Sequence, residues 1–135
     1  MSHEPKILIV DDDPTLCKSL KVFLSDKYSD IATAFSGREA LELLEANTFD
    51  LILLDVIMSD MNGYQLIDYI NKKGLEIPVI LITAYAPTDL EKETPPKGVY
   101  CSMMKPFDLE KLVGTVQNAL NRGQFLKSDE YSNCW

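Results

Sequence analysis

The chain of 135 residues is 46% hydrophobic and 25% charged, proportions typical of one soluble globular domain. Its formal net charge of −8, without a cluster of lysine and arginine, disfavours direct contact with nucleic acid. No apolar run approaches the ~20 residues of a membrane span and the N-terminus lacks a secretory signal, so we expect a cytoplasmic protein without membrane contact.

Strand-like and helix-like segments alternate along the first half of the chain. Residues 6–10 predict a strand buried on both faces, because the four residues from Ile7 to Val10 form a continuous apolar run. Asp13 then resembles a helix N-cap, with Pro14 in the first turn and an apolar stripe behind it at Leu16, Leu20, Phe23 and Leu24. Residues 31–34 predict a second strand, and the capping-box spacing that begins at Ser36 predicts the next helix.

The same alternation continues through the second half. A third strand ends at Leu54 and is followed by another helix with apolar residues at helical spacing. A fourth strand over 79–82 leads to a short helix over 89–94, which two consecutive prolines end. After a fifth strand over 99–103, the last helix begins at Asp108, and its predicted core positions are Leu109, Leu112, Val113, Val116 and Leu120.

Five successive strand–helix units predict an α/β fold. Right-handed crossovers between parallel strands place helices on both faces of the sheet, so the predicted domain has three layers. This domain takes in residues 6–122 and leaves an N-terminal tail over 1–5 and a C-terminal tail or linker over 123–135.

Side chains capable of chemistry follow four of the predicted strands. Asp11 and Asp12 follow the first strand, Asp55 the third, Thr83 the fourth and Lys105 the fifth. Because the carboxyl ends of parallel strands share one edge of a sheet, these side chains are expected to meet in one pocket.

The residue types in this pocket point to a metal-assisted phosphoryl chemistry. Neighbouring carboxylates repel one another unless one is protonated or a cation neutralises them. A small set of oxygen ligands such as Asp11, Asp12 and Asp55 favours Mg²⁺ that also holds water and a phosphate. Thr83 and Lys105 suit the equatorial oxygens of a phosphoryl group, and a carboxylate can itself be the nucleophile that becomes an aspartyl-phosphate.

Over residues ~5–122 the chain resembles the receiver domain of two-component response regulators. Four motifs carry the resemblance, in the order and separations typical of that family. They are Ile-Leu-Ile-Val-Asp-Asp-Asp-Pro at 7–14, the segment from Leu51 through Asp55 to Gly63, Ile-Thr-Ala-Tyr at 82–85, and Lys-Pro-Phe at 105–107.

The resemblance implies a flavodoxin-like (βα)5 three-layer sandwich with a parallel five-stranded sheet of order 2-1-3-4-5. It also implies that Asp55 is phosphorylated from the phosphohistidine of a sensor histidine kinase or phosphotransfer protein. Asp12 and Asp55 would hold Mg²⁺ directly, or Mn²⁺ in its place, with Asp11 acting through water and Ile57 adding its carbonyl oxygen. Thr83 and Lys105 would bind the phosphoryl oxygens.

Such a chain is not an enzyme for a separate metabolite, since it catalyses only its own phosphorylation and dephosphorylation. Its phosphorylated form would act on a downstream protein or output domain, or form a phosphorylation-dependent dimer. The chain departs from the family pattern at several positions. Ser59 replaces the usual proline after the phosphoacceptor, Ser102 replaces the usual aromatic residue on the fifth strand, Val99 replaces a small residue, and Pro95-Pro96 shortens the fourth helix.

Two other functions fit parts of the sequence. The spacing of Asp11, Asp13 and Thr15 also resembles the first motif of haloacid-dehalogenase-type phosphatases, in which Asp11 would be the nucleophile. That family needs a further acidic pair on a strand after the lysine, and here a helix is predicted at that point. The second alternative is a phosphorylation-independent interaction module on the receiver fold.

Overall fold

The computed structural model describes residues 4–83, 97–105 and 108–122. The strands are β1 (Lys6–Val10), β2 (Asp30–Ala34), β3 (Leu51–Asp55), β4 (Val79–Thr83) and β5 (Val99–Met104). The helices are α1 (Pro14–Leu24), α2 (Gly37–Ala46), α3 (Gly63–Lys72) and α5 (Leu109–Arg122). The observed strands begin and end within one residue of the predicted ones. The helix predicted over 89–94 lies outside the described residues.

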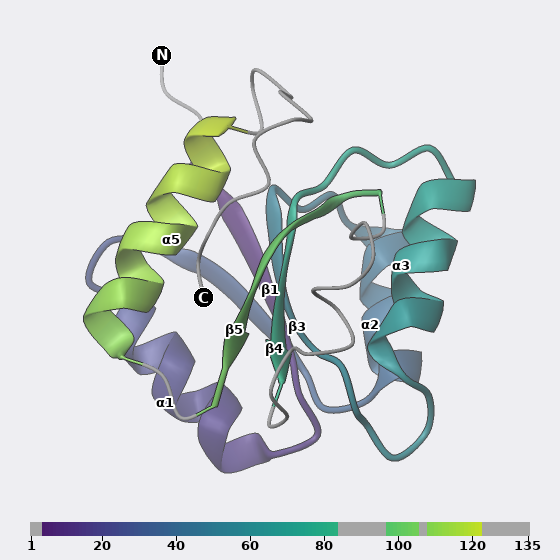
Figure 1. The fold of residues 1–135 in the computed structure, drawn as a ribbon, viewed down its shortest axis with the longest axis horizontal. Helices are drawn as coiled ribbons and strands as arrows, with labels where there is room; N and C mark the ends of the chain where they lie inside the picture. Colours follow the sequence, from purple (N-terminus) through teal and green to yellow (C-terminus); the bar gives the residue numbers. More distant parts are fainter. Residues whose placement is uncertain (1–3, 84–96, 106–107, 123–135) are drawn as a thin grey trace.

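The five strands form one parallel sheet in the order β2-β1-β3-β4-β5. Helices α1 and α5 cover one face of this sheet and α2 and α3 cover the other, which gives three layers (Figure 1). The strand order and the layers confirm the fold class predicted from the sequence. Among the described helices, none has both the length and the apolar character needed to cross a membrane.

The core consists of two apolar clusters, one on each face of the sheet. Strand β3 contributes to both clusters and is buried along its whole length, as its continuous apolar run predicts. The capping predictions also hold, since the Asp13 carboxylate accepts from the N–H groups of Thr15 and Leu16 at the start of α1.

The observed helix faces differ from the predicted ones in two details. In α1 the fully buried positions are Cys17, Leu20 and Leu24, while Phe23 is half-buried. Cysteine packs as a small hydrophobe, so Cys17 takes a core position that the count of large apolar residues missed. In α5 the predicted core position Leu109 is wrong, since this first residue of the helix is 38% exposed.

An irregularity in β5 decides which of its side chains face which helices. The register with β4 shifts between Val79 and Ile80, so that Tyr100 is the additional residue and packs against the cluster beneath α1 and α5. Ser102 lies two residues further along β5, where it pairs with Leu81 and is buried. Within the part of the chain that the structure describes, the Ser102 hydroxyl has no hydrogen-bond partner.

Candidate functional site

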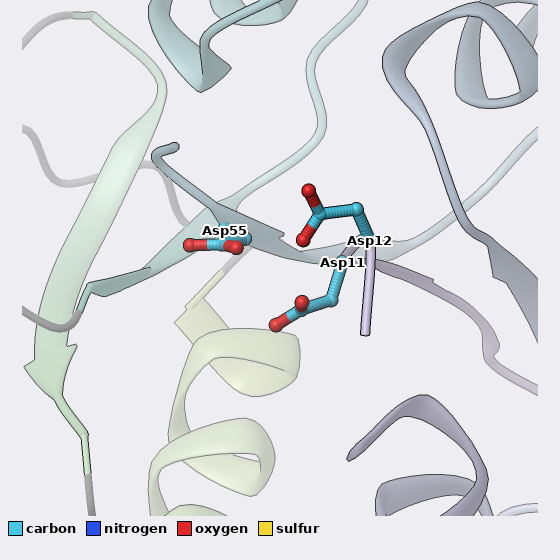
Figure 2. Close-up of side chains that lie close together, drawn as sticks. All are labelled: Asp11, Asp12 and Asp55. Atoms are coloured by element: carbon cyan, nitrogen blue, oxygen red, sulfur yellow. The ribbon is translucent and has the colours of Figure 1, made fainter. Parts of the chain in front are cut away.

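Three carboxylates meet at the edge formed by the carboxyl ends of the strands. Asp11 follows β1 and is fixed by a 3.1 Å hydrogen bond from its N–H to the carbonyl of Ala34, while Asp55 is the last residue of β3. The side chains of Asp11, Asp12 and Asp55 converge (Figure 2), and one oxygen of each lies within 4.8 Å of the others. Asp11 and Asp55 are buried, whereas Asp12 is exposed.

Lys105 brings a positive charge to these carboxylates from the end of β5. Its Nζ lies 3.0 Å from Asp11 Oδ2 and 3.7 Å from Asp55 Oδ2. Its backbone N–H donates to the carbonyl of Thr83 at 2.7 Å. This bond connects Lys105 to the buried residue that ends β4. The structure therefore brings Lys105 into contact with Asp11 and Asp55 and puts Thr83 beside the lysine's backbone.

The pKa values report how crowded the negative charges are. Burial, and after it the charge of Asp11, raises the pKa of Asp55 to about 6, although the charge of Lys105 acts in the opposite direction. Burial alone would lower the pKa of Lys105, but its hydrogen bond to Asp11 and the two nearby carboxylates raise it overall. Three carboxylates and one ammonium leave two formal negative charges in the site.

The loop between β3 and α3 contacts the acidic cluster at Asp12. Ser59 donates two hydrogen bonds to Asp12 Oδ2, from its N–H at 3.1 Å and from its Oγ at 3.0 Å. The carboxylate of Asp60 accepts from the N–H groups of Gly37 and Arg38, both at 3.0 Å, and these bonds lower the pKa of Asp60. The sequence predicted neither contact, because no local pattern marks residues so far apart in the chain.

Ile57 lies in the first part of that loop. Its N–H donates to Asp55 Oδ1 at 3.4 Å, and its backbone pairs with Asn62 in an isolated antiparallel bridge. Its side chain is 51% exposed next to Asp55. The N–H of Ile57 thus lies close to Asp55, while the predicted role of its carbonyl stays a prediction.

This donor set fits a hard divalent cation. All three converging side chains offer carboxylate oxygens, which Mg²⁺ prefers, and their number leaves room for water and phosphate oxygens. The residual negative charge and the raised pKa of Asp55 both indicate that a further positive charge would stabilise the site.

Comparison with known proteins gives a consistent family. A family model for the response regulator receiver domain matches residues 7–117. The transcriptional regulatory protein ZraR of Escherichia coli K12 is 36% identical over 121 residues, which are 89% of this chain and 27% of ZraR. The transcriptional regulatory protein CiaR of Streptococcus pneumoniae is 37% identical over 89% of this chain and 54% of CiaR. The chain therefore spans about a quarter to a half of these relatives.

Solved structures agree with the family model. The receiver domain of the Francisella response regulator 1452 is 30% identical, with a TM-score of 0.80 over 87% of this chain and 98% of that domain. The response regulator TrrA of Thermotoga maritima, solved in complex with Mg²⁺ and BeF, is 31% identical, with a TM-score of 0.72 over 85% of this chain and 98% of TrrA.

Proposed function

The chain belongs to the response regulator receiver family, and from that premise we propose that it is a phosphoacceptor switch in which Asp55 takes up the phosphoryl group. The donor would be the phosphohistidine of a sensor histidine kinase or of a phosphotransfer protein. The observation that carries the proposal is the buried Asp55 carboxylate, which lies among two further carboxylates and within 3.7 Å of the Lys105 ammonium.

In the proposed transfer, an oxygen of Asp55 bonds to phosphorus while the phosphorus–nitrogen bond of the phosphohistidine breaks. The imidazole leaves with the bonding electron pair and takes up a proton, and Asp55 becomes an acyl phosphate. Lys105, already held between Asp11 and Asp55, lies where it can offset the negative charge of the phosphoryl oxygens, and Thr83 would donate to one of them.

Asp12 and Asp55, with Asp11 acting through water and the carbonyl of Ile57, would hold Mg²⁺, or Mn²⁺ in its place. When bound, the ion supplies positive charge that offsets the carboxylates and the phosphoryl oxygens. The test is labelling of the chain with acetyl phosphate, which should add one phosphoryl group in the presence of Mg²⁺ and none with EDTA. Labelling that is equal in EDTA would refute the proposed role of the metal.

Binding of Mg²⁺ should also stabilise the fold, and Asp12→Ala should remove this effect. A ligand that binds only the folded state at 100 times its dissociation constant adds ~2.7 kcal/mol to the free energy of unfolding. We expect that gain for the wild type and little or none for the variant, measured by urea unfolding with Mg²⁺ and with EDTA. Glu45→Ala, at an exposed position on α2, is the matched control and should keep the full gain.

The acyl phosphate should be long-lived, because the side chain of Ile57 offers no group that orients an attacking water. Ile57→Asn would supply one hydrogen bond of about 1 kcal/mol, which corresponds to a roughly five-fold faster hydrolysis. The decay rate of the purified phosphorylated protein measures this. A wild type that decays as fast as the variant would show that Ile57 does not protect the phosphoryl group.

Family membership gives no support to a haloacid-dehalogenase-type phosphatase that uses Asp11. The downstream protein or output domain, a phosphorylation-dependent dimer and the cytoplasmic location stay predictions. A phosphorylation-independent interaction module differs from the switch in one measurable respect. Its affinity for a partner would be the same before and after complete labelling, whereas a switch requires the two affinities to differ.

A further inference from the structure

We propose that Ser59 is a positioning residue for the metal site, which holds the Asp12 carboxylate in its metal-binding orientation and so sets the affinity for Mg²⁺. The inference rests on the proposed function and deepens it. Its basis is the pair of hydrogen bonds that Ser59 donates to one oxygen of Asp12, at 3.1 Å from N–H and 3.0 Å from Oγ.

Asp12 needs such support because it is the exposed member of the acidic cluster. Asp11 is fixed by burial, by the Asp13 N–H at 3.0 Å and by Lys105, and Asp55 is fixed by burial at the end of β3. An exposed aspartate otherwise samples several rotamers, and a metal that selects one of them pays for the lost freedom. The two bonds from Ser59 impose that order before the metal binds.

The bonds leave the second oxygen of Asp12 available. Both donors of Ser59 go to Oδ2, and in the described segments Oδ1 of Asp12 accepts no hydrogen bond. A carboxylate held by one oxygen can offer the other to a cation, which is the usual arrangement of a hydrogen-bonded metal ligand. Ser59 thus bonds to one oxygen of Asp12 and leaves the other free for a cation.

Ser59 can act as a fixed donor because the loop around it is anchored. The neighbouring Asp60 accepts from two N–H groups at the start of α2, and the side chain of Met61 lies so close to Gly37 that a Cβ there would collide with it. On the other side of Ser59, Ile57 pairs with Asn62. These contacts on both sides of Ser59 hold the loop that carries its two donors.

The two donors can be removed separately. Ser59→Ala deletes the hydroxyl and keeps the N–H, whereas Ser59→Pro deletes both, since proline has no N–H. Ser59→Thr retains both donors. Loss of hydrogen-bonding partners of a metal ligand typically weakens metal binding by about 10- to 100-fold. We expect a loss near the lower figure for Ser59→Ala, a larger loss for Ser59→Pro, and wild-type affinity for Ser59→Thr.

The experiment is isothermal titration of the whole, unphosphorylated chain with MgCl₂ at constant ionic strength. Ser25→Ala is the matched control, because it removes a serine hydroxyl bonded to the carbonyl of Val22 at the far end of α1. Urea unfolding in EDTA checks that each variant is folded. The graded loss of affinity, with rescue by threonine and no change in Ser25→Ala, would support the inference.

The contrary results separate this inference from the proposed function. If the wild type binds Mg²⁺ and Ser59→Ala binds it equally well or more tightly, Ser59 does not position Asp12 and the inference fails alone. If the wild type itself does not bind Mg²⁺, the proposed metal site fails and the inference fails with it. Because Ser59→Ala changes no backbone group, its result decides the matter even if the proline variant does not fold.

Discussion

Asp55→Asn is expected to abolish labelling by acetyl phosphate and Mg²⁺ while leaving the chain folded. The amide has nearly the same shape as the carboxylate, but it is not a nucleophile that forms an acyl phosphate. Of the neighbouring acids, Asp11 has both oxygens engaged, by Lys105 and by the Asp13 N–H, and Asp12 has one oxygen bonded to Ser59. Intact-mass measurement should therefore show no added phosphoryl group.

The control for this result is Asp68→Asn, which removes a surface carboxylate that pairs with Lys72 on α3, away from the site. This variant should be labelled as completely as the wild type. Undiminished labelling of Asp55→Asn would show that another side chain is the acceptor. Peptide mapping of the labelled variant would then identify which acid takes its place.

The fold could be predicted almost entirely from the sequence, because burial imposes its own periodicity. Strands β1 and β3 are continuous apolar runs since both faces of a central parallel strand are covered. The caps at Asp13 and Ser36 mark the starts of helices with local hydrogen bonds that depend only on neighbouring residues. Such signals lie within a few residues of one another and can be read without knowing the tertiary structure.

The acidic site was predictable for a different reason. Asp11 and Lys105 follow strands and Asp55 ends one, and the topology of a parallel sheet forces the ends of the strands together. What the topology does not determine is which groups then pair. The 3.0 Å contact of Lys105 with Asp11 depends on the lengths and rotamers of both side chains after packing.

The support for the site could not be read from the sequence. Ser59 and Asp12 are 47 residues apart, and Asp60 meets Gly37 across 23 residues, so no local spacing signals either contact. The same limit applies to the irregularity at Tyr100, where a one-residue shift in register overrides strict alternation of side chains along β5. These features depend on how the strands, helices and loops pack against one another in the folded chain.

In EDTA, the free energy of unfolding of the wild type should fall relative to that of Asp55→Asn as the pH rises from about 4 to 7. The pKa of Asp55 is raised from its ordinary 3.8 to about 6 in the folded state, chiefly by burial and by the charge of Asp11. Between these two values the folded chain keeps a proton that the unfolded chain has lost. Rising pH therefore destabilises the folded wild type through this group.

The size of the effect follows from the shift in pKa. Each pKa unit corresponds to 1.36 kcal/mol, so a shift of about two units sets an upper limit of about 3 kcal/mol. Asparagine does not titrate. The difference in the free energy of unfolding between the two proteins therefore separates the contribution of Asp55 from that of groups whose effect on stability changes with pH in the opposite direction. Asp60 is one of these, because its lowered pKa makes it stabilising as the pH rises.

Urea unfolding of both proteins in EDTA at several pH values between 4 and 8 measures the difference directly. Most of the change should occur between pH 4 and 6 and should level off above pH 7, where Asp55 is ionised in both states. If the free energies of unfolding of the two proteins change in parallel with pH, the ionised Asp55 carboxylate does not destabilise the folded state. Addition of Mg²⁺ at pH 7 should then close part of the gap, because the positive charge offsets the same repulsion that the asparagine removes.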